Sequence, residues 1–216
     1  MKERTLSRNI CDANNSDCVK CSVNGKLMCT FNINDTLYFI LPVISAWITL
    51  ILGIAYGFVI GKINLPILII FSVGYIGYLI FFFQVWENKM LCSHCPYYAF
   101  ENDRYVKCYA NYGIHKAWKY NPAPMTTSEK VQFLIGITLF AGIPLILFLM
   151  IGLYIYFGVS LILTIIWLIS MHFLSCSKCP NFSCPLNNVS KDVVDEYLKL
   201  NSVMRKAWKD QGYIID

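Results

Sequence analysis

Long apolar stretches separated by charged segments dominate the pattern of this sequence. No Asp, Glu, Lys or Arg occurs in residues 36–61, 63–86 or 131–177. A transmembrane helix needs about 20 apolar residues, so the first two stretches predict one helix each and the third predicts two. We therefore expect four transmembrane helices, at about residues 37–60, 65–86, 131–151 and 158–174.

The third stretch is expected to reverse direction within residues 152–158, where two glycines flank interfacial tyrosines. The predicted fold class is an all-α integral membrane protein with two transmembrane hairpins. The chain then divides into a Cys-rich N-terminal arm, a first hairpin, a loop rich in Cys and aromatic residues, a second hairpin and a Cys-rich tail. These segments comprise residues 1–36, 37–86, 87–130, 131–175 and 176–216.

Charge predicts the orientation of the four helices. The composition is 56% hydrophobic and 14% charged, which excludes a soluble enzyme. Every Lys and Arg except Lys62, and all 13 Asp and Glu, lie in the arm, the loop and the tail. The positive-inside rule places these segments, with both termini, in the cytoplasm of a multi-pass protein in the lipid bilayer. The small excess of positive charge suits anionic headgroups and does not indicate nucleic acid binding.

All ten cysteines lie on this predicted cytoplasmic side. In a reducing compartment, clustered thiols indicate metal ligands, whereas the opposite orientation would favour five disulfides. A CxxC knuckle can turn both thiols toward one ion, and it occurs at Cys18–Cys21, Cys92–Cys95 and Cys176–Cys179. Three knuckles in one chain predict metal binding without identifying the metal.

Three ligand sets follow from the spacing. The loop offers Cys92, Cys95, Cys108 and His115, which is close to a zinc set of three cysteines and one histidine. The arm offers four thiols, and the tail offers three thiols together with His172 one turn earlier. The arm residues are Cys11, Cys18, Cys21 and Cys29, and the tail residues are Cys176, Cys179 and Cys184.

Structural zinc supporting a scaffold or an interaction surface for a cytoplasmic protein is the function that we expect. The alternative is an iron–sulfur protein that transfers electrons at the membrane. Cys95, Cys179 and Cys184 are each followed by Pro, which resembles the closing Cys-Pro of bacterial ferredoxins. A further alternative is the handling of soft metals by the thiols.

A short repeat follows the second and fourth predicted helices. Residues 92–96 read Cys-Ser-His-Cys-Pro and residues 176–180 read Cys-Ser-Lys-Cys-Pro, which suggests a duplicated unit of a hairpin and a knuckle. A weaker match aligns residues 36–42 with residues 138–144, each ending in Pro. The two knuckles could share one site, or each could pin its own hairpin.

Four helices with a Cys-rich loop between the second and third resemble the layout of protein S-acyltransferases of the DHHC type. That resemblance implies an Asp-His-His-Cys run carrying a cysteine nucleophile. The nearest string here, residues 93–96, reads Ser-His-Cys-Pro and lacks the acid and the second histidine, so the activity is not carried over. No other catalytic motif is present, and the predicted helices hold no charged residue that would mark an ion pathway.

Two further patterns predict helix packing. Gly53, Gly57 and Gly61 form a small-residue stripe that allows close approach of a helix, within the chain or in a homodimer. The tail predicts an amphipathic helix after an N-cap at Ser190. Its apolar face consists of Val193, Tyr197, Leu200, Met204 and Trp208. We expect this face to pack on the protein rather than on lipid.

Overall fold

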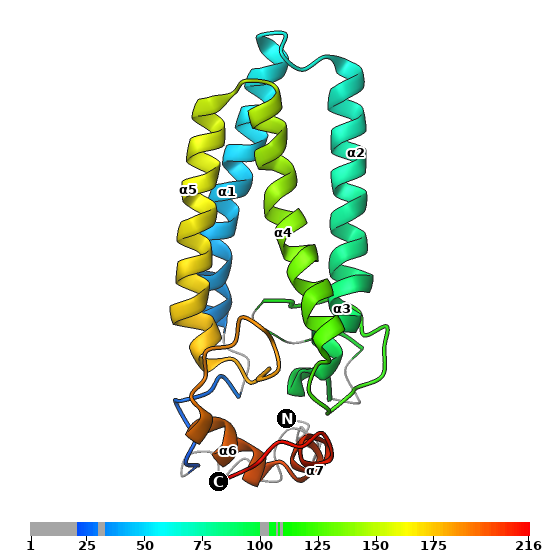
Figure 1. Cartoon of the computed structure of the whole chain (residues 1–216). Helices are drawn as coiled ribbons and strands as arrows, with labels where there is room; N and C mark the ends of the chain where they lie inside the picture. The colour runs from blue at the N-terminus through cyan, green and yellow to red at the C-terminus, as the bar shows by residue number, and fades with distance from the viewer. Residues whose placement is uncertain (1–20, 30–32, 100–103, 107, 109) are drawn as a thin grey trace, which may run out of the picture.

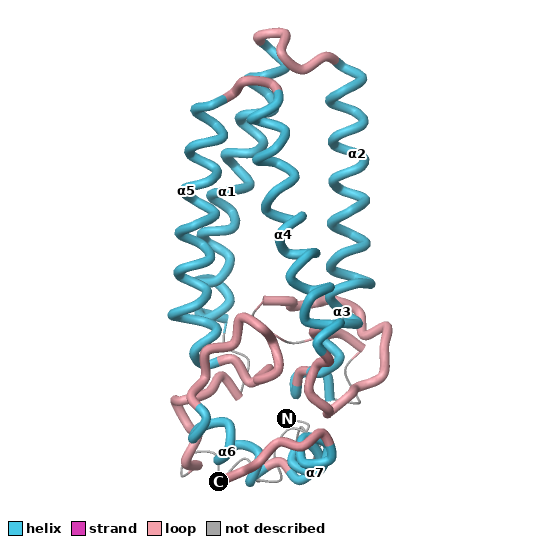
Figure 2. The backbone as a smooth tube through the Cα atoms, viewed as in Figure 1, coloured by secondary structure: helices cyan, strands magenta, loops and turns pink. Residues whose placement is uncertain are grey.

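The computed structural model describes residues 21–29, 33–99, 104–106, 108 and 110–216. These residues form helices and loops without any strand (Figure 2). The four long helices are α1 (Ile33–Val59), α2 (Leu65–Phe81), α4 (Thr127–Met150) and α5 (Tyr154–Ser170). All four are long and apolar enough to cross a membrane, in spans of Thr36–Val59, Leu65–His94, Thr127–Met150 and Tyr154–Lys178. The predicted number of membrane-length helices is confirmed.

Four helix boundaries differ from the prediction, the first being the start of α1, which lies at Ile33 rather than at residue 37. The second helix continues beyond α2 through a π-helical turn, η2 (Phe82–Trp86), into α3 (Glu87–Met90). The third begins at Thr127 because Thr126 and Glu129 form a capping box, with the Thr126 amide donating to Glu129 Oε2 at 2.8 Å. The fourth begins at Tyr154 because the turn before it is short: Gly152 adopts a φ of 68°, which reverses the chain at once.

The main neighbour of α1 in space is not its neighbour in sequence. α1 packs chiefly against α5 and has few contacts with α2, to which it is joined (Figure 1). The glycine stripe explains this pairing: a Cβ on Gly53 would lie 2.6 Å from Phe148 Cζ and 2.9 Å from Tyr156 Cδ1. A Cβ on Gly57 would meet Ile63 and Leu153 in the same way. Gly53 and Gly57 therefore allow close contacts within the chain, whereas Gly61 lies beyond the end of α1, with a φ of 75° and nothing within 4 Å of an added Cβ.

The two short turns meet at one end of the bundle, which we name the turn end. Lys62 donates from Nζ to the carbonyl oxygen of Gly152 at 2.8 Å. The bond joins the α1–α2 connection to the α4–α5 connection. The remaining loops and the C-terminus lie at the opposite end, which we name the loop end (Figure 1).

The tail forms two helices, where the sequence predicted one. These are α6 (Lys191–Leu200) and α7 (Ser202–Asp210), which separate at Asn201. Asn201 is extended, and its side chain accepts from the Met204 amide at 2.9 Å, so it ends one helix and caps the next. The predicted apolar face packs on the protein, as expected. Its core joins Tyr197, Leu198, Met204 and Trp208 to Val23 and Leu27 of the N-terminal segment.

Candidate functional site

The two repeated knuckles at the loop end form the same kind of turn. Each is a 3-10 turn, η3 (Cys92–His94) or η6 (Cys176–Lys178). The π-helical turn η5 (Met171–Ser175) leads directly into η6, whereas α3 separates η2 from η3. In each, the serine after the first cysteine donates to the carbonyl four residues earlier. Ser93 Oγ bonds Lys89 O at 2.6 Å, and Ser177 Oγ bonds Phe173 O at 2.7 Å. The repeat in sequence is therefore a repeat in local structure.

Proline sets the direction of the second thiol in each knuckle. A residue before Pro avoids the helical region, because the Pro ring would clash with it. Cys95 has φ −81° and ψ 137°, and Cys179 has φ −76° and ψ 125°. Both knuckles therefore end in an extended cysteine that turns the chain away from its helix.

Three hydrogen bonds tie together segments that are far apart in the chain. The Met28 amide donates to Lys178 O at 2.9 Å, and the Tyr97 hydroxyl donates to Met28 O at 2.7 Å. Asn181 Nδ2 donates to Leu91 O at 3.0 Å. The N-terminal segment, the loop knuckle and the tail knuckle are thereby held side by side.

The thiols of the two knuckles, Cys108 and Cys184 lie together at the loop end, three of them buried and three half-buried, and we name these six the thiol group. It consists of Cys92, Cys95, Cys108, Cys176, Cys179 and Cys184. The described cysteines form no disulfide. Cys179 interacts electrostatically with Cys95, Cys108, Cys176 and Cys184, and Cys92 interacts with Cys108 and Cys184. The structure thus brings together ligands that the sequence assigned to two separate sets.

Burial and proximity both favour the protonated thiols when no cation is bound. Burial, followed by the neighbouring Cys179 thiol, raises the pKa of Cys108 to about 12. Burial and the thiols of Cys108 and Cys179 raise the pKa of Cys95 well above its usual range, and burial with Cys179 raises that of Cys184. A soft cation would replace these protons, because thiolates are the form that binds metal.

Glu87 and Asn111 are site residues that sequence analysis missed. Asn111 Nδ2 lies 3.1 Å from Glu87 Oε1 and 3.3 Å from Cys92 Sγ, so one amide group holds a carboxylate beside a thiol. Glu87 is 7% exposed, and within the described part of the chain its Oε2 atom has no hydrogen-bond partner. A buried carboxylate oxygen without a donor, next to several thiols, fits a position that a cation would occupy. The signal in the sequence was an acidic residue directly after an apolar span.

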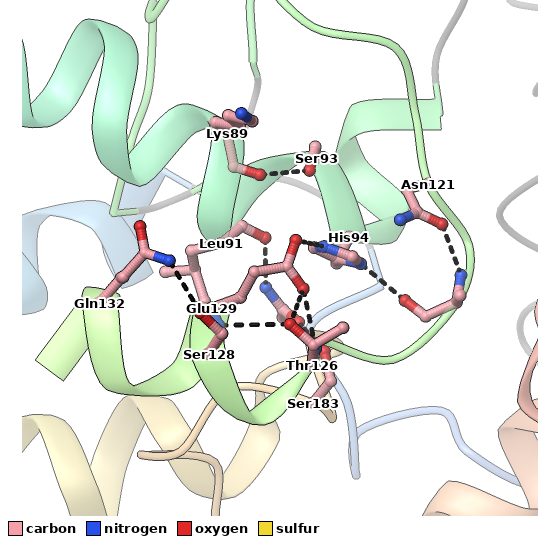
Figure 3. Close-up of polar contacts among 12 residues, drawn as sticks. Lys89, Leu91, Ser93, His94, Asn121, Thr126, Ser128, Glu129, Gln132 and Ser183 are labelled. Carbon is pink, nitrogen blue, oxygen red and sulfur yellow. Dashed lines mark hydrogen bonds and ion pairs between the residues drawn. The ribbon is translucent and has the colours of Figure 1, made fainter. Parts of the chain in front are cut away.

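His94 fixes the loop knuckle to the start of α4 (Figure 3). Its ring is buried, with Nδ1 2.6 Å from Ala123 O and Nε2 3.4 Å from Glu129 Oε1. His94 therefore has a structural role that joins the knuckle to the capping box of α4.

The other predicted ligands are not buried with the thiol group. His115 is exposed, and its ring packs edge-on to Tyr105 at a centroid distance of 5.8 Å. His172 is also exposed and packs against Phe173. Cys21 and Cys29 are half-buried beside the tail core, although Cys29 interacts with Tyr97. Cys11 and Cys18 lie outside the described residues, so the predicted four-cysteine arm site cannot be placed.

Among the described residues, no three Cys, His, Asp or Glu side chains are arranged to hold one metal ion. The six thiols of the thiol group are more than the four ligands that a tetrahedral ion needs. They are also spaced too widely for any three of them to form bonds of roughly 2.3 Å to one zinc ion. Comparisons of the chain with protein-family models, with curated proteins and with solved structures give no match.

Proposed function

We propose that the protein is a multi-pass membrane protein whose loop end is a cytoplasmic, cysteine-ligated metal centre. The centre serves as a scaffold, and structural zinc is the first candidate metal. One observation carries the proposal: the thiols of the loop knuckle, the tail knuckle, Cys108 and Cys184, which are buried or half-buried, interact with one another. A metal bound there would join the loop knuckle to the tail knuckle, which lie far apart in the chain, and its binding energy would contribute to folding.

An iron–sulfur cluster is the second candidate, and one observation favours it. Six thiols gather in one group, while within the described chain no three are arranged for a single ion. A polynuclear cluster needs thiolates spaced around a larger inorganic core. Such a centre would supply electron transfer at the membrane surface in addition to structural support.

Metal analysis of protein purified anaerobically in detergent tests both candidates. Stoichiometric zinc in a colourless sample supports the scaffold. Stoichiometric iron with acid-labile sulfide, and a visible absorbance bleached by dithionite, supports the cluster. Protein that is folded and monodisperse without a bound metal would contradict the proposal.

Orientation is tested by labelling. Lys89 lies in α3, Lys130 near the start of α4 and Lys119 in the loop between them, whereas Lys62 lies in the α1–α2 connection at the turn end. The proposal places the loop end in the cytoplasm. A cysteine introduced for Lys119 should therefore react with an impermeant maleimide only after the membrane is opened, whereas one introduced for Lys62 should react in intact cells. The reverse pattern would contradict the cytoplasmic location.

A further inference from the structure

Basic and aromatic side chains gather where the loop meets the end of the second membrane-length helix. We name this cluster the basic patch, and it consists of Lys89, Arg104, Tyr105, Lys116, Trp118 and Lys119. Lys89 Nζ lies 5.1 Å from the centre of the Trp118 ring, and the Lys116 amide donates to Arg104 O at 2.9 Å. Tyr98 connects these two contacts, because its hydroxyl accepts from the Trp118 amide at 2.9 Å and its ring lies 5.6 Å from Lys116 Nζ.

Positive charge on the patch is open to solvent. Residues 104–128 contain no Asp or Glu, and the nearest acids before them, Glu101 and Asp103, lie outside the described residues. Lys89 and Lys119 are both exposed, and neither forms an ion pair within the described part of the chain. These two ammonium groups can therefore bind an anion without first breaking a contact to a described carboxylate.

The position of Lys89 sets the depth of the patch in a membrane. On the continuous helix α2–η2–α3, Phe81 is 50% exposed and Val85 is 42% exposed, so both face lipid when this helix spans a bilayer. Lys89 follows at the same spacing, about 6 Å further along the axis, which is comparable to the thickness of one headgroup layer. Trp118, whose ring contacts Lys89, is exposed and lies at the same depth.

Anionic phospholipid is the partner that fits these groups. Trp and Tyr are typical of the headgroup layer, where the apolar ring and the polar atom both find a suitable environment. Lys at this depth attracts the negative headgroups of anionic lipids, and the attraction acts over about one Debye length, ~10 Å at moderate salt. A soluble protein or a nucleic acid would have to displace lipid to reach Lys89, whereas a phospholipid already occupies this layer.

We propose that the basic patch binds the headgroups of anionic phospholipids, with Lys89 and Lys119 contacting the negative headgroup and Trp118 packing beside the lipid at the edge of the hydrocarbon core. The proposal rests on the part of the proposed function in which α2 spans a membrane. It does not depend on the metal centre, because no member of the patch belongs to the thiol group.

Native mass spectrometry of the full-length protein in detergent tests the lipid preference. Phosphatidylserine and phosphatidylcholine with the same acyl chains are titrated separately. We expect phosphatidylserine to bind at least about fivefold more tightly, since one basic residue near an anionic headgroup contributes roughly that factor. Lys89→Gln/Lys119→Gln should remove most of this preference. Lys206→Gln/Lys209→Gln is the matched control, because it removes the same charge from exposed positions of α7 in the tail.

Three results of this titration would overturn the proposal. They are equal affinities of the wild type for the two lipids, an equal loss of preference in the patch variant and the control, and displacement of phosphatidylserine by inorganic phosphate, which would identify a site for free phosphate. Metal content, measured on the same samples, should be unchanged in both variants. Spanning by α2 is checked separately by the labelling of Lys62→Cys and Lys119→Cys, so its failure is distinguishable from a failure of lipid binding.

Fluorescence quenching in vesicles that contain phosphatidylserine measures the depth of Trp118. The difference in emission between the wild type and Trp118→Phe isolates this ring from the other tryptophans. Lipids brominated near the ester should quench this difference more strongly than lipids brominated near the methyl end of the chain, because the ring is expected at the headgroup boundary. Stronger quenching by the second lipid, or no quenching by either, would overturn the placement of the patch on the membrane.

Discussion

The hydroxyl of Tyr75 on α2 donates a 2.8 Å hydrogen bond to the carbonyl oxygen of Phe140 on α4. In an uninterrupted helix this carbonyl would accept from the amide of residue 144, but residue 144 is Pro and has no amide hydrogen. Tyr75 therefore supplies from a neighbouring helix the donor that Pro144 removes. One turn further along α2, the Tyr78 hydroxyl donates to Gly136 O at 2.6 Å. These two bonds fix α2 against α4.

Tyr75→Phe tests this replacement directly. It leaves the Phe140 carbonyl without its donor, and we expect a loss of about 1 kcal/mol in the free energy of unfolding. Pro144→Ala restores an amide hydrogen at residue 144, so Tyr75→Phe should cost less in that background. Reversible unfolding in mixed micelles measures the four proteins of this double-mutant cycle. Equal costs in both backgrounds would show that the two residues act independently.

Two glycines of α4 should respond in opposite directions to alanine. A Cβ on Gly136 would lie 2.2 Å from Phe82 Cε2, a clash that a buried ring and a helix backbone cannot easily relieve. Gly136→Ala should destabilise the protein by about 1–3 kcal/mol. Gly142→Ala is the control on the same helix, since a Cβ there meets nothing within 4 Å. Its melting temperature should match that of the wild type or exceed it, because Ala favours the helix. Similar losses in both variants would refute this helix contact.

Replacing one thiol in each knuckle tests whether they share a metal centre. Cys92→Ser and Cys176→Ser should each lower the bound metal and the melting temperature, whereas Cys11→Ser in the N-terminal arm should do so weakly. Sharing predicts that the double variant loses little more than either single one; separate sites predict additive losses. Full metal content in both single variants, measured by elemental analysis, would remove these cysteines from the ligand set.

Glu87→Gln tests the carboxylate beside the thiol group. The substitution keeps the size of the side chain and removes its charge, so we expect a lower metal content at unchanged expression. Glu196→Gln is the control, because Glu196 pairs with Lys26 on the exposed surface at 3.3 Å. A matching metal content in the two variants would show that the Glu87 charge does not contribute to the centre.

Acid should loosen the tail through Asp195. Burial by itself would raise the pKa of Asp195, but hydrogen bonds from Lys191 and from the Asp216 amide outweigh it, so the pKa is lowered overall. A carboxyl whose folded pKa lies below the unfolded value of about 3.9 contributes stability above that pH and loses it as the pH falls further. Hydrogen exchange of α6 and α7 should therefore accelerate on acidification. Asp195→Asn should exchange faster at neutral pH and show a weaker dependence on pH. An identical pH profile in the two proteins would exclude Asp195 as the cause.

Local sequence determined the number of apolar helices, the two equivalent knuckles and the apolar face of the tail. Each depends on residues close together in the chain: a run of apolar side chains, a Cys-Pro pair, or a helical spacing. The tail nevertheless forms two helices that separate at Asn201. This residue is extended and caps the second helix, although the apolar pattern continues across it as in a single helix.

Tertiary structure alone decided which distant residues meet. It paired α1 with α5 through Gly53 and Tyr156, placed Glu87 and Asn111 beside Cys92, and left His115 on the surface. Partitioning into a membrane depends on summed composition, which a sequence displays directly. Contact between helices depends on the shapes of facing side chains and on the hydrogen-bonding needs of facing groups. One such group is the backbone carbonyl of Phe140, which has no amide donor at Pro144 and accepts from Tyr75 instead. Those needs are met by residues whose positions in the chain do not reveal that they are neighbours.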